Sequence, residues 1–113
     1  MEIIKEHNQN TFFIRIEGDV DASSSINLNE ALEEASESGA NRILVDCDKL
    51  EYISSAGLGV FMSFVEDFEE KEIAFVLYNL KDNVRKVFDL LGLDRLLAIT
   101  GTEEEALEKS NGV

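Results

Sequence analysis

The sequence predicts a single α/β domain with a mixed, mainly parallel sheet of about five strands and helices packed against it. Its 113 residues fit one domain, since a domain ordinarily needs roughly 100–200 residues. Hydrophobic residues make up 44% of the chain, which is ordinary for a folded protein. Short apolar runs alternate with amphipathic helical stretches, a succession typical of right-handed crossovers between parallel strands. We therefore expect one domain over residues 1–113, with the element order β-β-α-β-α-β-α-β-α.

The first two elements are predicted to be strands that form a hairpin. Residues 2–6 contain an apolar pair, and Gln9-Asn10 is typical of a turn. Apolar and polar side chains then alternate over residues 11–17, which indicates a strand with one solvated face. The N-terminal edge of the sheet is therefore expected to be antiparallel. The segment Gly18-Asp19-Val20-Asp21 is expected to break the second strand.

A helix from about Ser24 to Ser38 is predicted next, because leucine and alanine recur there at positions i, i+3, i+4 and i+7. Serines at its start are candidate N-caps, and Gly39 is a candidate C′ residue. The apolar run Ile43-Leu44-Val45 indicates a strand covered on both faces, as in a parallel sheet. Residues 48–53 are expected to form a loop.

A second helix is predicted to carry Gly57 and Gly59 in its first turn, where each costs about 1 kcal/mol of helix propensity relative to alanine. Like the other phenylalanines, Phe64 is expected in the core, but it lies off the apolar stripe of this helix, and a contact with a partner is the alternative. The stripe itself consists of Leu58, Phe61, Met62, Val65 and Phe68.

The last third of the chain continues the alternation of strands and helices. Residues 73–77 indicate a second buried strand. A helix closed by Gly92 is predicted next, with an apolar stripe that consists of Val84, Val87, Phe88 and Leu91. Residues 96–99 predict a short strand. The pair of Thr102 and Glu105 is typical of a capping box, so a last helix is expected to run to about Ser110.

The charge and the rare residues exclude several classes of function. With 24 Asp and Glu against 10 Lys and Arg, the net charge is −14, which repels nucleic-acid phosphates and anionic membranes. A single cysteine, Cys47, and a single histidine, His7, argue against a disulfide, a zinc site and a Ser-His-Asp triad. No signal peptide or membrane-spanning run is visible. We expect a cytoplasmic protein, monomeric when free, without metal or cofactor.

The segment Tyr52–Gly59 is the most informative for function. It lies between a predicted strand and a predicted helix, at the kind of strand end where ligands gather in open α/β sheets. A phosphate on Ser55 would face unpaired backbone N–H groups and the positive end of a helix dipole. Gly57 and Gly59 would leave room for another protein to approach. Two serines before a helix are also typical of a simple N-cap, and the spacing alone leaves both interpretations open.

Three segments together carry a resemblance to a known family. They are Leu50–Val60 with the sequence LEYISSAGLGV, the turn Gly18-Asp19-Val20-Asp21, and the helical segment Val84–Leu93 with its hydrophobic-Gly-Leu ending. The first resembles the signature of the STAS family, and within it that of the bacterial anti-sigma factor antagonists. The other two resemble the family's turn after the second strand and its corresponding helix. The resemblance covers essentially the whole chain and implies a single STAS domain.

This resemblance implies a regulator without enzymatic activity. Members of the family bind an anti-sigma factor that is also a serine kinase, and thereby free the sigma factor. The kinase inactivates the antagonist by phosphorylating one serine, and a PP2C-type phosphatase restores it. The acceptor position corresponds to Ser55. Ser54 stands where the family has an aspartate, and Ala56 stands where it has a second hydroxyl residue.

By the same resemblance, the residues that bind the partner are Asp21, Ser54, Ser55, Ala56, Gly57, Leu58 and Gly59. Asp21 would contact a basic residue of the kinase, and a role in a turn or an N-cap fits its position equally well. One alternative is a STAS module in another partner-switching or scaffold pathway. Another is a small flavodoxin-like nucleotide-binding domain. The sequence argues against this alternative, because it contains no P-loop, no dinucleotide motif and no paired acid and base.

Overall fold

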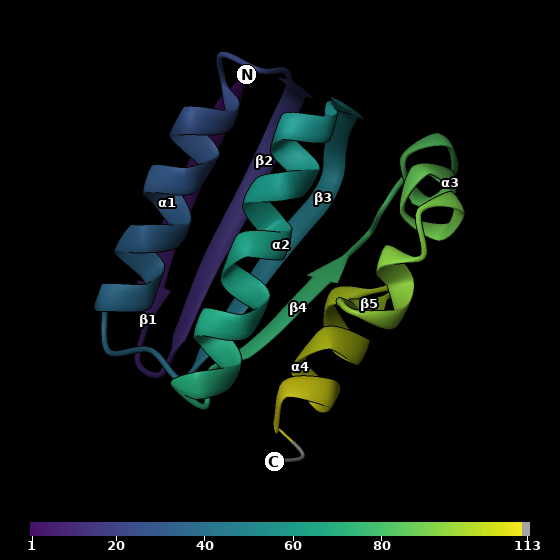
Figure 1. Cartoon of the computed structure of the whole chain (residues 1–113). Coiled ribbons are helices and arrows are strands. Elements are labelled where there is room, and N and C mark those ends of the chain that lie inside the picture. The colour runs from purple at the N-terminus through teal and green to yellow at the C-terminus, as the bar shows by residue number, and fades with distance from the viewer. Residues whose placement is uncertain (112–113) are drawn as a thin grey trace.

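Five strands form one sheet in which the spatial order, β1-β2-β3-β4-β5, is also their order along the chain. This computed structural model describes residues 1–111 (Figure 1). β1 pairs antiparallel with β2, and every later pair is parallel. The predicted α/β class and the N-terminal hairpin are therefore confirmed. The strands are β1 (Glu2–Asn8), β2 (Thr11–Val20), β3 (Arg42–Ile53), β4 (Ala74–Tyr78) and β5 (Ala98–Thr100).

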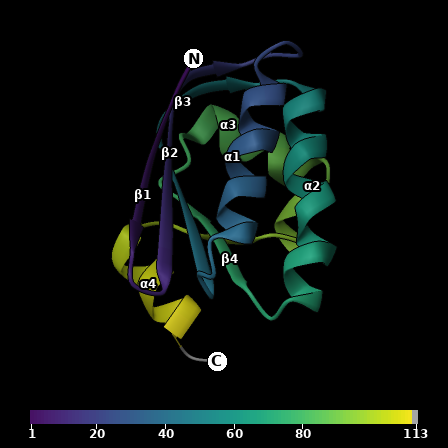
Figure 2. The same ribbon diagram turned by 90° about the vertical axis from the view of Figure 1, so that its left-hand side faces the viewer.

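The helices cover both faces of this sheet. They are α1 (Ser25–Glu37), α2 (Ser55–Glu70), α3 (Asp82–Leu90) and α4 (Glu103–Asn111), with a 3₁₀ turn η1 (Leu93–Arg95) after α3. The larger core joins α1, α2 and α3 to the sheet face that carries Ile43 and Val45. α4 covers the other face over Leu44 and Val76, and Figure 2 shows it across the sheet from α1 and α2.

The two central strands are longer than the sequence predicts. β2 continues through the expected break at Gly18-Asp19-Val20-Asp21 as far as Val20, and β3 continues to Ile53 where a loop is predicted. Two register shifts between these strands each place one extra residue in β3. The buried residues in this part of β3, Cys47, Leu50 and Ile53, recur at every third position. The period-two alternation that marks a strand is therefore absent there.

The helix ends differ from the prediction mainly around α3. Gly39 follows α1 with a left-handed φ of 86°, as predicted for a C′ residue. α3 ends at Leu90, because Gly92 (φ 72°) turns the chain away. Leu91, which we expected on the buried stripe, is consequently exposed. The chain then forms η1, so β5 begins at Ala98, later than predicted.

Within residues 1–111, no helix combines the length and apolar character needed to cross a membrane.

Candidate functional site

The carboxyl ends of β2 and β3 and the first turns of α1 and α2 lie at one edge of the sheet, at the top of Figure 1. The backbone N–H of Ser54 donates to the carbonyl of Val20 at 2.8 Å, which ties the start of α2 to the end of β2. Asp21 follows directly after Val20. The structure thus brings Asp21 to the same edge as the segment Ser54–Gly59.

Ser54 is the N-cap of α2. Its backbone is extended (φ −81°, ψ 169°), and its Oγ accepts a hydrogen bond from the backbone N–H of Gly57 at 3.2 Å. Its carbonyl accepts a second one from the N–H of Leu58 at 3.0 Å. Serine and aspartate are comparably good N-caps. Ser54 therefore fixes the start of the helix as an aspartate would, but adds no negative charge beside Ser55.

Ser55 is the first residue of α2 and is exposed. None of the hydrogen bonds found among residues 1–111 engages its hydroxyl, whereas the Ser54 hydroxyl accepts one. Ala56, the next residue, is also exposed. The N–H groups at the start of a helix have no carbonyl partner within it, and the helix dipole places positive charge there. The Ser55 hydroxyl is accessible, and its surroundings favour an anionic group.

The two glycines of the first turn have different surroundings. Gly57 is buried, and a Cβ on it would lie 2.7 Å from Cγ1 of Ile53 and 2.8 Å from Cγ1 of Val20. Glycine at this position therefore lets α2 pack closely on the ends of the two strands. Gly59 is exposed, and a Cβ on it would have no contact within 4 Å. The open space expected near Ser55 lies at Gly59, and Gly57 serves packing instead.

The other large side chains of α2 belong to the core. Leu58 is buried, so it supports the site from below. Phe64 is buried as well, with its ring centroid 5.2 Å from that of Phe68, so it is a core residue and the alternative of a partner contact is wrong. The buried face of α2 is therefore rotated relative to the predicted stripe, on which Met62 and Val65 are only half-buried.

The Asp21 carboxylate organises the turn between β2 and α1. Its Oδ1 accepts hydrogen bonds from the Ser23 hydroxyl (2.8 Å), the Ser24 backbone N–H (2.9 Å) and the Ser24 hydroxyl (3.0 Å). The Asp21 N–H donates in return to Oγ of Ser24 at 2.9 Å. These bonds, with the Ser24 N–H contributing most, lower the pKa of Asp21 to about 2. Asp21 thus has the turn role that the sequence left open.

We expect the variant Asp21→Asn to reduce the loss of stability in acid. A carboxyl group whose pKa falls from 3.8 to about 2 on folding stabilises the folded chain above pH 3.8 and loses this effect as the pH falls through 2. The wild-type chain should therefore lose more stability than Asp21→Asn over this range, and should be the more stable of the two near neutral pH. Urea denaturation at neutral and acidic pH measures both; equal losses in acid would contradict this role for Asp21.

Two exposed residues of β3, Glu51 and Tyr52, extend this edge and are not among the predicted contact residues. Glu51 accepts a hydrogen bond through its carbonyl from the side-chain amide of Asn83 (3.3 Å), and its carboxylate lies 3.7 Å from Nζ of Lys81. The start of α3 therefore flanks the site. Tyr52 keeps 54% of its surface exposed, and exposed aromatic side chains are enriched at protein interfaces. The loop predicted for residues 48–53 gave no indication that both are exposed residues of a strand.

Cys47 has no place in this site. It is buried in β3, and its burial together with the neighbouring Asp46 carboxylate raises the pKa of the thiol. A thiol of this kind stays protonated, and it packs as a small apolar side chain.

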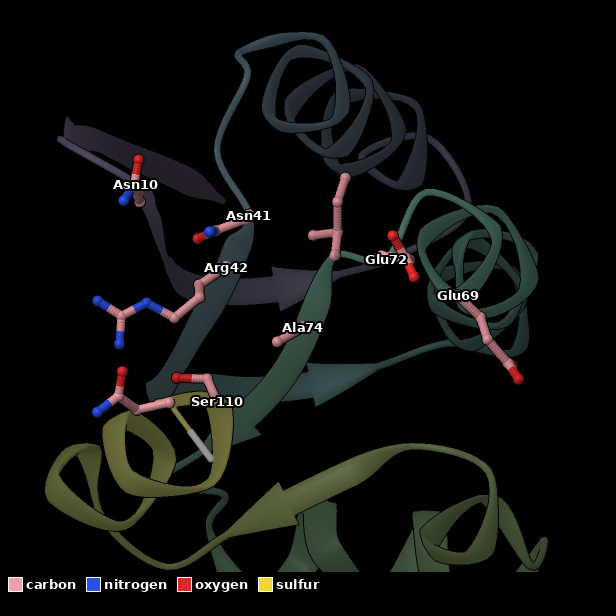
Figure 3. A pocket seen from close by; sticks show the side chains of 9 residues that line it. Asn10, Asn41, Arg42, Glu69, Glu72, Ala74 and Ser110 are labelled. Carbon is pink, nitrogen blue, oxygen red and sulfur yellow. The ribbon is translucent and has the colours of Figure 1, made fainter. Parts of the chain in front are cut away.

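A pocket of about 610 Å³ lies at the opposite edge of the sheet, near the β1–β2 turn and the end of α4 (Figure 3). Its lining is largely polar and includes Asn10, Asn41, Arg42, Glu69 and Ser110. Nucleotides in open α/β sheets bind at the carboxyl ends of strands, usually against a glycine-rich turn. This pocket lies at the amino ends, and no glycine lines it. It gives no support to the nucleotide-binding alternative.

Known proteins resemble this chain over nearly its whole length. The sequence model of the STAS domain family matches residues 2–106. The anti-sigma-B factor antagonist of Listeria monocytogenes is 28% identical over 102 residues, which are 90% of each protein. The structure of unphosphorylated SpoIIAA, an anti-sigma factor antagonist, superposes with a TM-score of 0.81 at 24% identity, covering 99% of this chain and 98% of that one. Phosphorylated SpoIIAA from Bacillus gives a TM-score of 0.73 at 24% identity, covering 96% and 98%.

Proposed function

This chain belongs to the STAS domain family, and we propose that it acts as an anti-sigma factor antagonist, which binds an anti-sigma factor and so frees a sigma factor. The name of the Listeria relative and the fold shared with SpoIIAA support this function. The observation that carries it is the position of Ser55. Its exposed hydroxyl stands at the first residue of a firmly capped helix, where a kinase can reach it.

In this proposal, phosphorylation of Ser55 switches the antagonist off. A phosphoserine adds about −1.5 to −2 charges at pH 7. The start of α2 stabilises a phosphate in place, so the surface changes while the backbone need not move. A partner packed against Ser55 would lose its fit and would have to desolvate a dianion. The existence of both phosphorylated and unphosphorylated SpoIIAA structures supports such a mechanism by analogy.

The partner in this proposal is an anti-sigma factor with serine kinase activity, and a PP2C-type phosphatase regenerates the antagonist. The exposed residues Asp21, Ser55, Ala56 and Gly59 form the contact surface, together with the half-buried cap Ser54. Gly57 and Leu58 act from below by fixing the position of α2. The protein itself needs no catalytic residue, and it would work in the cytoplasm with its partners.

We expect the purified chain to take up one phosphate, on Ser55, when incubated with ATP and the ATPase-like serine kinase encoded nearest its gene. Mass spectrometry of the digested protein locates the phosphate. The variant Ser55→Ala should take up none. Ser54→Asp is the matched control, because aspartate keeps the cap of α2 and removes the neighbouring hydroxyl.

The outcomes separate the parts of the proposal. Phosphate on Ser54 in place of Ser55 would show that the acceptor is wrong. Absence of phosphate with a kinase that nevertheless binds the chain would contradict the switch but not the antagonist function. A chain that binds no anti-sigma factor in either state would contradict the function itself.

A further inference from the structure

Three leucines at the end of α3 and η1 are far more exposed than the other apolar side chains of that region. Leu90 keeps 85% of its surface exposed, Leu91 61% and Leu96 58%. We call these three residues the leucine patch. The left-handed turn at Gly92 produces it, because that turn ends α3 before Leu91 can join the core. All three lie within seven residues of the chain, and several exposed apolar side chains from one short segment mark an interaction site more often than scattered single ones.

The charge around the leucine patch differs from that of the rest of the chain. Residues 81–96 hold four of the ten Lys and Arg residues but only three of the 24 Asp and Glu residues. Taken together, the remaining residues hold 21 acidic side chains against six basic ones. Lys86 precedes Leu90 by one helical turn and shares its face, and Arg95 adjoins Leu96. Arg85 pairs with Asp89 at 3.0 Å and Lys81 with Glu51 at 3.7 Å. Lys86 and Arg95 are therefore the cations of this segment that have no ion pair among residues 1–111.

We propose that the leucine patch is the contact through which two copies of this chain form a two-fold symmetric dimer. A two-fold interface places the same patch of the two copies face to face. The charges of such a patch must therefore not repel an identical set of charges. The acidic remainder of a chain with net charge −14 fails this condition. Residues 81–96 meet it, because basic and acidic residues are nearly balanced there and each can face its opposite in the second copy.

The dimer is expected to be weak and strengthened by salt. Three leucines per copy cover a small area, and interfaces below roughly 1,200 Å² are typical of transient complexes. A dissociation constant on the order of 10–100 μM follows for an interface of this class. Salt screens the repulsion between the two acidic bodies, while burial of leucine is not screened. This dependence is opposite to that of a complex held by ion pairs between oppositely charged proteins.

Sedimentation equilibrium of the full chain tests this proposal at low and high sodium chloride. We expect the average mass of the wild-type chain to rise from that of a monomer toward that of a dimer with concentration, and to rise further at high salt. The double variant Leu90→Ser/Leu91→Ser should stay monomeric in both. Lys86→Glu/Arg95→Glu, which keeps all three leucines, should weaken the dimer at least tenfold. Circular dichroism spectra of the variants check that each one folds.

Ile26→Ser is the matched control, because Ile26 is equally apolar, is 62% exposed and lies on α1 outside the patch. It should dimerise as the wild-type chain does. A wild-type chain that is monomeric at millimolar concentration and high salt would overturn the proposal. So would a loss of the dimer in Ile26→Ser equal to that in the leucine variant. A monomeric wild type whose leucine variant binds the anti-sigma factor more weakly would instead assign the patch to that partner.

Discussion

The variant Ser55→Glu is expected to bind the anti-sigma factor roughly 200- to 1000-fold more weakly than the wild-type chain, a loss of about 3–4 kcal/mol. The added carboxylate lies at an exposed helix start, so the loss comes from steric misfit and from desolvating a charge against the partner. Calorimetry with the purified anti-sigma factor measures it. Ser55→Ala should keep its affinity and should remain bound when ATP is added, because it lacks the acceptor hydroxyl.

The matched control for this experiment is Ser63→Glu. Ser63 is exposed on the same helix two turns farther on, where its hydroxyl donates to the carbonyl of Val60 at 2.7 Å. Both substitutions change the net charge equally, so their difference isolates the position. We expect Ser63→Glu to bind within a few-fold of the wild-type chain. Equal losses of affinity in the two variants would mean that net charge alone governs binding. Unchanged affinity in Ser55→Glu would contradict the proposed phosphorylation switch.

Gly57→Ala and Gly59→Ala are expected to change the stability of the fold in opposite directions. Both substitutions gain about 1 kcal/mol of helix propensity. At Gly57 the new methyl would lie under 3 Å from the branched side chains of Ile53 and Val20, and overpacking of this kind typically costs about 1–3 kcal/mol or more. At Gly59 the methyl meets nothing. Gly57→Ala should therefore be destabilised by up to about 2 kcal/mol, and Gly59→Ala stabilised by up to about 1 kcal/mol.

Urea denaturation at neutral pH measures both effects. The same two variants also distinguish the packing of α2 on the strands from the access of the partner to the proposed interface. If the partner approaches over Gly59, the more stable variant should bind it more weakly, because the methyl fills the open space beside α2. A gain of stability in Gly57→Ala would show that α2 can move away from the strand ends, contrary to the close packing described above.

The sequence predicted an element correctly wherever its apolar residues kept one spacing, of a strand or of a helix, from start to end. Alternation over residues 11–17 and the helical recurrence before Gly39 both predicted elements that the structure contains. Prediction failed in β3, because two inserted residues change the spacing of buried positions from two to three. It failed again at Leu91, where hydrophobic spacing continues past the residue at which the helix stops. In both cases the backbone geometry overrides the local pattern.

At the candidate site, the motif predicted which residues are involved, but not the contacts that determine their roles. The motif located Ser54 and Ser55, and a cap beside an exposed serine is what the structure contains. It could not distinguish Gly57 from Gly59, because their difference depends on Ile53 and on Val20 from another strand. Neither could it reveal the hydrogen bonds that occupy the Asp21 carboxylate.

The sequential strand order has a consequence for how the chain is made. Each strand pairs with the one before it, so each pairing encloses a single connection, and the entropy lost in closing it grows only slowly with its length. Once Glu70 has left the ribosome, the three longest strands, the turn that contains Asp21 and the helix α2 are present, and these hold the proposed contact surface. Later elements add to the open side of a sheet that already exists. Folding during synthesis can therefore place Ser55 and Asp21 side by side before the C-terminal third, with the flanking start of α3, has been translated.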